Sequence, residues 1–573
     1  MIGHSGPLLP LVSLVWPLLL GLLASLPAIR PHALRLLPLA SLPALWLALT
    51  GVQGLTLAPE LLLGVRLGAE RPAALLLGLT AALWFAAAIH AQGSMAGTRK
   101  PAVFSGFWCL TLAGNLGVFL AQDVVTFYVA FAAVSLSSYF LVVHEATDAA
   151  LRAGRVYAVL AIIGEVCLLV AFVIGVGAAN GLMIDDIRAA LPTAPLGGMA
   201  TALLIAGFGI KAGLMPLHMW LPLAHPAAPT PASAVLSGAI VKAGIIGLML
   251  FLPAMTGAAT VLVPLGLGAA FVAALVGLRV RAPKAILAYS TISQMGLAIA
   301  LIAAATRLPE GDMAPVAYYA IHHGLAKGAL FLGVAVVAAA HGRWRAATLL
   351  VAGLVALSVA GAPLTGGGLA KAAAKTVLGP WESLALTLSA ATTTLLLGWF
   401  WVRLAASPVK ERSATASTGA APSPLIWAPT AALALAALAL PWWLWSEWSG
   451  LPGDYPWRLA TLWSALWPVA LGLAMIVVMV ATRWPAGTQD EADPLRAARW
   501  IAAELGPLRT IPGKLATIRS EIADRMELSS RSGGTMLTNA AESVEHALLR
   551  WRMSGFIIIM FVLAVALSID PGT

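Results

Sequence analysis

Apolar runs long enough to cross a membrane follow one another along almost the whole chain. A membrane-spanning helix needs about 18 or more predominantly apolar residues. Such runs lie near 8–28, 33–51, 72–91, 101–120, 123–143, 155–178, 198–222, 232–253, 259–278, 284–305, 315–340, 346–377, 381–404, 424–446, 459–481 and 553–569. Only 10% of the 573 residues are charged, against about 25% in an average soluble protein. The sequence therefore predicts an all-α polytopic membrane protein with about 16 transmembrane helices.

Basic residues are unevenly divided between the loops that join these runs. Fourteen Lys and Arg fall in the odd-numbered loops and five in the even-numbered loops. Because cytoplasmic loops collect Lys and Arg, we expect the odd-numbered loops in the cytoplasm and both termini outside. The formal net charge of +10 thus reflects topology and indicates no nucleic-acid partner. We expect a multi-pass protein of the cell's inner (cytoplasmic) membrane, with the first apolar run retained as a span.

One stretch, from 209 to 244, combines lysines with prolines inside apolar sequence: GIKAGLMPLHMWLPLAHPAAPTPASAVLSGAIVKAG. A lysine at the centre of a span costs about 2.5 to 3.5 kcal/mol, yet Lys211 and Lys242 both lie well inside apolar runs. Pro216 and Pro222 remove backbone donors, which is tolerated at membrane depth only beside protein or a water-filled cavity. The pattern indicates a discontinuous helix beside ionisable groups, as in ion pathways. The alternative is two ordinary spans joined by a Pro-rich loop, with both lysines reaching the membrane surface.

A second interrupted span has the sequence VAGAPLTGGGLAK at 359–371. Pro363, Gly366 and Gly367 break the helix, and Lys371 follows directly. Two interrupted spans in corresponding positions are the sequence sign of inverted repeats around an ion site.

Between the two breaks, a histidine and a lysine share one helix face. His323 and Lys327 are four residues apart, so their side chains are neighbours on a helix. Histidine titrates near physiological pH, which suits a proton relay between two lysine sites. The alternative is a packed histidine bonded to a nearby carbonyl.

The breaks and the apolar runs together predict the organisation of the chain. We expect no cofactor or metal, because the two cysteines, Cys109 and Cys167, are too few for a cluster and lie in predicted spans. The polar stretch before the last run has apolar residues at helical spacing, which favours amphipathic helices on the cytoplasmic face over a disordered loop. The expected parts are N-terminal transmembrane helices (1–100), a first five-helix repeat (101–253), a second (259–404), C-terminal transmembrane helices (405–481), amphipathic helices (482–552) and a last transmembrane helix with its tail (553–573).

Four ordered blocks resemble a known family. They are KAGLMPLHMWLPLAHPAAPTPASAVLSG…VKAG, LAYSTISQMG (287–296), HHGLAKGALFLG (322–333) and GAPLTGGGLAK (361–371). They resemble the antiporter-like subunits of respiratory complex I, Mrp-type cation/proton antiporters and group 4 membrane-bound hydrogenases, over roughly residues 60–405. The hydrogenase-4 component B-like branch is favoured. The resemblance implies two inverted five-helix repeats, each with a discontinuous helix.

The resemblance also implies roles for single residues. Lys211 matches the lysine of the family's seventh span, and Lys242 that of the eighth. His323 and Lys327 match the central relay, and Lys371 matches the twelfth-span lysine that leads to the exit. We expect these five side chains to line one hydrated path near the bilayer midplane.

Two positions depart from the family pattern. In FAAVSLSSY, Ala132 stands where the family usually carries a fifth-span glutamate, and Tyr319 replaces a histidine one turn before the relay. We expect Glu165, an acid deep in a neighbouring span, to supply the missing counter-charge to Lys211. The alternative is that Glu165 faces a neighbouring subunit or a water-filled gap.

These features favour a proton-translocating membrane subunit of an energy-converting complex, similar to NADH/quinone oxidoreductases or membrane-bound hydrogenases. It would sit among other membrane subunits in the lipid bilayer, move protons (with Na+ as the alternative ion), and contain no redox centre of its own. One alternative is a subunit of a cation/proton antiporter. Another is a membrane energy-coupling partner of a cytoplasmic enzyme, of the inorganic-carbon uptake type. A scaffold that has lost pumping is also compatible with Ala132.

Overall fold

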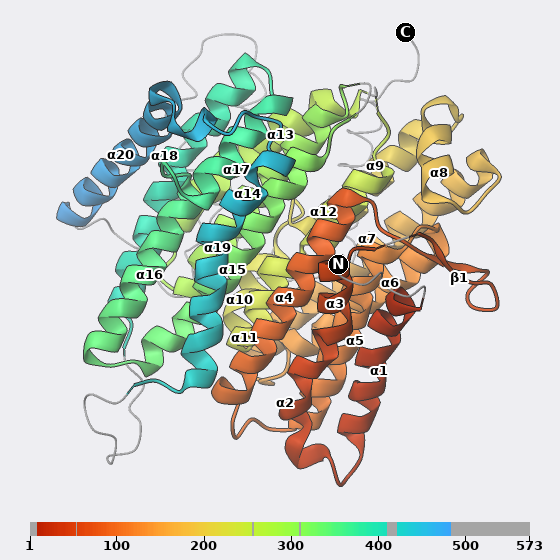
Figure 1. Cartoon of the computed structure of the whole chain (residues 1–573), viewed down its shortest axis with the longest axis horizontal. Helices are drawn as coiled ribbons and strands as arrows, with labels where there is room; N and C mark the ends of the chain where they lie inside the picture. The colour runs from red at the N-terminus through yellow and green to blue at the C-terminus, as the bar shows by residue number, and fades with distance from the viewer. Residues whose placement is uncertain (1–7, 53, 255–256, 309–310, 409–420, 483–573) are drawn as a thin grey trace, which may run out of the picture.

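The protein is a bundle of membrane-spanning helices (Figure 1). The computed structural model describes residues 8–52, 54–254, 257–308, 311–408 and 421–482. In these ranges thirteen helices are long and apolar enough to cross a membrane, and Leu9–Ser25 and Gly197–Ala212 are shorter apolar helices. The expected spans up to residue 481 coincide with these helices, which confirms the all-α polytopic fold. The expected last span (553–569), and the polar segment 482–552 apart from Thr482, lie outside the described residues.

The N-terminal part contains three spans and a short hairpin. Its elements are α1 (Leu9–Ser25), α2 (Ala33–Leu36), α3 (Leu42–Thr50), strands β1 (Thr56–Ala58) and β2 (Val65–Leu67), and α4 (Arg71–Ser94). The strands pair antiparallel, with Thr56 opposite Leu67. The span expected at 33–51 is not one regular α-helix. Pro38 and Pro43 each fall at the start of a new helical segment, where a residue without an N–H is tolerated.

Two sets of helices follow, and each contains one interrupted span. The first set is α5 (Pro101–Leu120), α6 (Val124–Val142), α7 (Asp148–Ala179), the short α8 (Ile184–Ala190), α9 (Gly197–Ala212), α10 (Trp220–Ala227), α11 (Thr230–Val235), a π-helical segment (Leu236–Ile240) and α12 (Lys242–Phe251). The second set is α13 (Ala258–Gly277), α14 (Pro283–Ala305), α15 (Ala314–Ala339), α16 (Gly342–Ala360), α17 (Gly366–Ala374) and α18 (Pro380–Ala405). Two more spans, α19 (Pro424–Trp448) and α20 (Leu459–Ala481), complete the described chain.

The two sets pack in the same way. In the first set α5 packs on α6, α7 on α9, and α9 on α12. In the second set α13 packs on α14, α15 on α16, and α16 on α18. The interrupted span is the fourth of five in both sets. The predicted repeats, 101–253 and 259–404, fit this pattern, and their inverted relation stays a prediction.

The centre of the bundle is formed by α14 and α15. Every residue in the apolar window of α14 is buried, against 28% for the peripheral α20. Close packing relies on small residues. A Cβ on Gly266 of α13 would collide with the carbonyl of Gly296 on α14, so the two helices touch backbone to backbone. The central histidine and two of the buried lysines, Lys242 and Lys327, lie in or against this tightly packed centre.

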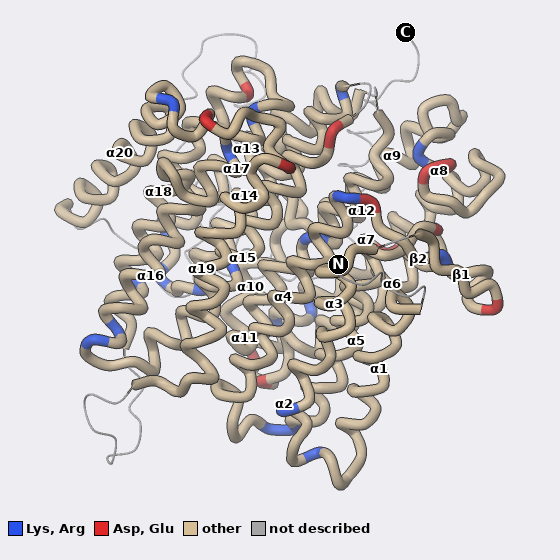
Figure 2. Tube along the Cα trace, in the orientation of Figure 1, with Lys and Arg blue, Asp and Glu red and all other residues tan. Residues whose placement is uncertain are grey.

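Charged residues gather at the ends of the helices. Figure 2 shows Lys and Arg at the lower end of the bundle, near α2 and α16, and several Asp and Glu toward the upper end, near α8, α12 and α13. The interior is almost free of charge in this view, apart from scattered basic residues.

Candidate functional site

The first helix break lies between α9 and α10. Gly213 ends α9 in the left-handed region, at φ +80°, which favours glycine. The Ile210 carbonyl in the last turn of α9 accepts from the Trp220 indole N–H over 2.7 Å and from the Gly213 N–H over 3.2 Å, so it is satisfied. Pro216 lies within the break. Pro222 lies in the first turn of α10, where a missing N–H costs little.

Lys211 is buried at the end of α9, beside this break. Lys211 is only 5% exposed. This burial excludes the alternative in which its side chain reaches the membrane surface. Its ammonium donates to the Tyr157 hydroxyl over 3.1 Å. Tyr157, on α7, donates in turn to the Ser135 carbonyl on α6 over 2.8 Å.

Glu165 shares a small cavity with Lys211. The cavity has a volume of about 10 Å³ for the centre of a water-sized sphere, and its lining includes Glu165, Lys211, Tyr157 and Ser135. That volume is about the minimum that holds one water. Among the described residues neither Glu165 oxygen has a hydrogen-bond partner, and the four ion pairs within 4.0 Å do not include Lys211. The pairing of Glu165 with Lys211 therefore stays a prediction, and it would require a bridging water.

Lys242 and His323 form a direct contact in the centre of the bundle. The Lys242 Nζ lies 2.7 Å from the His323 Nδ1, and both residues are at most 1% exposed. Lys242 also donates to the Ser237 carbonyl over 2.9 Å. That carbonyl lies in the π-helical segment Leu236–Ile240, and such irregularities often mark functional sites.

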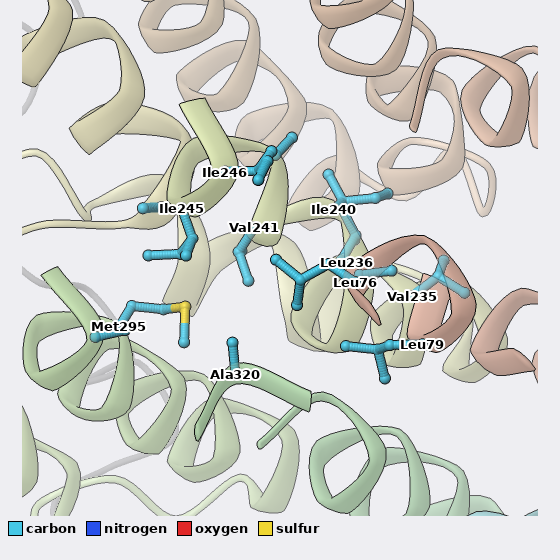
Figure 3. Packing of buried hydrophobic residues seen from close by; sticks show 14 of the residues in the cluster. Leu76, Leu79, Val235, Leu236, Ile240, Val241, Ile245, Ile246, Met295 and Ala320 are labelled. Atoms are coloured by element: carbon cyan, nitrogen blue, oxygen red, sulfur yellow. The ribbon is translucent and has the colours of Figure 1, made fainter. Parts of the chain in front are cut away.

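Apolar side chains pack beside the segment that carries Lys242. Figure 3 shows Leu236 and Ile240 near Leu76 of α4, and Ile245 near Met295 of α14. In such surroundings a charged group is costly unless it is hydrogen-bonded. Lys242 meets this requirement through the Ser237 carbonyl and the His323 ring.

Lys327 lies one helical turn beyond His323 on α15. It is fully buried, and its ammonium donates to the Leu287 carbonyl of α14 over 3.1 Å. Tyr319, one turn before His323, donates to Gln294 over 2.6 Å. Tyr319 thus fills the position of the expected histidine with a hydrogen-bonded hydroxyl.

His322, next to the relay residue His323, contacts the second break and is not among the pathway residues predicted from sequence. Its Nε2 lies 2.9 Å from the Ser358 hydroxyl of α16. The same hydroxyl accepts from the Gly367 N–H over 3.2 Å. A Cβ on Gly367 would collide with the Ser358 carbonyl and lie 2.7 Å from the His322 ring. The sequence signal for His322 is the pair of adjacent histidines in the HHG block. Adjacent residues of a helix point to different neighbours, so the two histidines contact different groups.

Lys371 lies at the second break. α16 ends at Gly361, at φ +97°, and Pro363 lies in the turn before α17, which begins with Gly366 and Gly367. The Lys371 ammonium donates to the Ala360 carbonyl over 2.9 Å and to the Ser389 hydroxyl over 3.4 Å. The break therefore exposes a carbonyl that the lysine uses as its acceptor.

All six predicted pathway residues are buried, at 0–7% exposed. The four lysines described above have neutral oxygens as acceptors. A neutral oxygen can accept a hydrogen bond from a charged or an uncharged amine. The arrangement can therefore hold each lysine in either protonation state, as a proton relay requires.

The sequence and the fold have known relatives. The family described as NADH:quinone oxidoreductase/Mrp antiporter, TM, matches residues 121–398. Hydrogenase-4 component B of Escherichia coli (strain K12) is 32% identical over 257 residues, covering 42% of this chain and 38% of that protein. NAD(P)H-quinone oxidoreductase chain 4 1 of Picosynechococcus sp. is 32% identical over 242 residues, covering 41% of this chain and 45% of that protein. The matched part thus spans less than half the length of these two relatives.

A solved structure has the same fold. A chain in the Mrp complex from Dietzia sp. DQ12-45-1b superimposes with a TM-score of 0.67 and 23% sequence identity, covering 91% of this chain and 62% of that chain. This likeness extends over both five-helix sets. Residues 121–398, just under half of the chain, thus form a segment of the NADH:quinone oxidoreductase/Mrp antiporter transmembrane family.

Proposed function

We propose that the chain is a proton-translocating membrane subunit of a larger energy-converting complex, of the NADH/quinone oxidoreductase or membrane-bound hydrogenase type. The observation that carries the proposal is the set of four buried lysines: Lys211 and Lys371 lie at the two helix breaks, Lys242 follows the π-helical segment, and Lys327 lies within α15. Buried lysines are costly in a membrane interior. Their satisfaction by neutral oxygens suits groups that gain and lose protons.

In this proposal protons move between lysines through the histidines of α15. The Lys242–His323 contact of 2.7 Å allows direct proton transfer within hydrogen-bond reach. His322 and Ser358 connect the centre to the break beside Lys371. Charge changes in a partner subunit would supply the energy for proton movement. A positive charge that arrives near a lysine disfavours the protonated form of that lysine.

A second candidate is a subunit of a cation/proton antiporter. The likeness in fold to a chain of the Mrp complex favours it. In that case Na+ movement would accompany proton movement without a redox partner.

The proposal includes partners and a location. We infer that other membrane subunits surround the chain in the cell's inner membrane, with both termini outside. The uneven distribution of Lys and Arg between the loops supports this orientation.

The test measures proton uptake by everted membrane vesicles that contain the native complex. Vesicles are energised separately with NADH, with hydrogen and with an imposed Na+ gradient, and a pH-sensitive dye reports acidification. We expect one redox donor to drive uptake, and we expect Lys371→Ala to abolish it with normal assembly. Arg99→Gln, at an exposed loop position, is the matched control. Uptake only with the Na+ gradient would favour the antiporter, and normal uptake by Lys371→Ala would overturn the proposal.

A further inference from the structure

A second cavity opens beside Lys371, on the side of α17 away from the central histidines. It has a volume of about 30 Å³ for the centre of a water-sized sphere, enough for about two waters. Its polar lining consists of Lys371, Lys375, Thr387, Thr461 and Ser464, and no carboxylate is among its lining residues.

The two lysines of this cavity lie on one face of the same helical segment. Lys371 is in α17, and Lys375 begins the 3₁₀ turn that continues it. Residues four apart on a helix are neighbours and lie about 6 Å apart along the axis. Among the described residues the Lys371 ammonium donates to Ala360 and Ser389, whereas the side chain of Lys375 has no hydrogen bond or ion pair.

The cavity lies between the buried relay and one end of the bundle. Lys371 is 7% exposed, and Lys375, one turn further along, is only partly buried. Thr461 and Ser464 belong to the first two turns of α20, and Thr387 to the early part of α18. α16 begins at the end of the bundle that carries Arg343, so α17 ends at the opposite one. That end is the outer one in the orientation that the loop charges predict.

We propose that Lys375 is the proton acceptor after Lys371 and that the hydroxyls of Thr387, Thr461 and Ser464 hold the connecting waters. This inference rests on the proposed function. The protonated Lys371 gives a proton to a cavity water, which passes one of its own protons to the neutral Lys375 amine. The resulting Lys375 ammonium then releases that proton to the outer solution.

Electrostatic repulsion gives the step its direction. Two ammonium groups four residues apart on one helix face repel each other. No carboxylate lines the cavity to offset this repulsion. A new proton arriving on Lys371 therefore favours release of the proton already on Lys375. Through Thr461 and Ser464, α20 lines this proposed exit path for protons. This helix lies beyond the matched family segment 121–398.

The test distinguishes a Lys375 that relays protons from a Lys375 whose positive charge has only a structural role. Lys375→Arg keeps the charge but cannot release a proton, because arginine stays protonated. We expect Lys375→Ala and Lys375→Arg to slow proton transport equally, by about tenfold or more. Lys375→His should recover part of the rate, with a pH profile shifted toward acid. The double variant Thr461→Val, Ser464→Ala should also be slow, and Thr376→Val, an exposed neighbour outside the lining, should be unchanged.

The outcomes are distinguishable from failure of the proposed function. Each variant is compared with Lys371→Ala at equal amounts of assembled complex. If Lys371→Ala transports normally, the proposed function itself is wrong. If Lys371→Ala is inactive while Lys375→Arg transports at the normal rate, only the exit role of Lys375 is overturned.

Discussion

At the residue scale, the buried lysines are held by neutral oxygens and a histidine rather than by carboxylates. A carboxylate partner would favour the charged lysine strongly, whereas a carbonyl or hydroxyl accepts from either form. This difference explains how a chain can place ionisable groups inside a membrane bundle without fixing their charge.

The pairing of Glu165 with Lys211 is tested by exchanging the two charges. Both side chains line one cavity without a direct bond, so either single reversal leaves two like charges facing one space. We expect Glu165→Lys and Lys211→Glu each to lose assembly or transport, and the double variant to recover part of it. A double variant no better than the worse single one would show that the two groups act separately.

His322 is a second residue whose part in transport can be measured. His322→Ala removes the ring that meets the Ser358 hydroxyl, so we expect slower transport and a loss of stability of about 1 kcal/mol. Ser358→Ala should give a similar rate. The matched control is His341→Ala, at the start of α16 and away from the buried lysines, and a normal rate in His322→Ala would exclude the connection.

Some of these residues are predictable from the sequence and others are not. Lysines inside apolar runs are visible in sequence because their type contradicts their surroundings. Tyr157 and Ser358 are ordinary polar residues of membrane helices, and their roles arise only when α7 meets α9 and α15 meets α16. Three-dimensional packing, rather than residue type, defines that part of the site.

At the element scale, the two helix breaks have the same local structure. Each ends its first helix on a left-handed glycine, Gly213 or Gly361, and each exposes carbonyls near a lysine. Proline and glycine predicted both breaks from sequence, because these residues interrupt helices. The π-helical segment before Lys242 carries no such signal, since Leu236–Ile240 is ordinary apolar sequence around one serine and one glycine.

A glycine substitution tests the second break. A Cβ on Gly367 would collide with the Ser358 backbone, so Gly367→Ala must displace α17 from α16. We expect a stability loss of about 1–3 kcal/mol, as for overpacked cores, and a loss of proton transport. Thermal unfolding of the purified protein measures the first effect. Gly268→Ala in α13, where a Cβ meets nothing within 4 Å, should leave both unchanged.

At the scale of the whole molecule, the loop charges predict one orientation in the membrane. Residue 99 lies in a loop predicted to be cytoplasmic, and residue 453 in one predicted to be outside. Both native cysteines are buried. In intact cells a membrane-impermeant thiol reagent should therefore label Gly453→Cys and not Arg99→Cys. The reverse labelling would invert the predicted topology.

The central claim is that protons cross the membrane through the buried lysines, and Lys242 tests it most directly. Lys242 is fully buried and contacts His323 in the centre of the bundle. The measurement is the initial rate of proton uptake by vesicles containing Lys242→Ala, at the same amount of assembled complex as the unaltered chain and the Arg99→Gln control. The account predicts that uptake falls to background. Uptake at the normal rate would show that protons do not pass through these lysines.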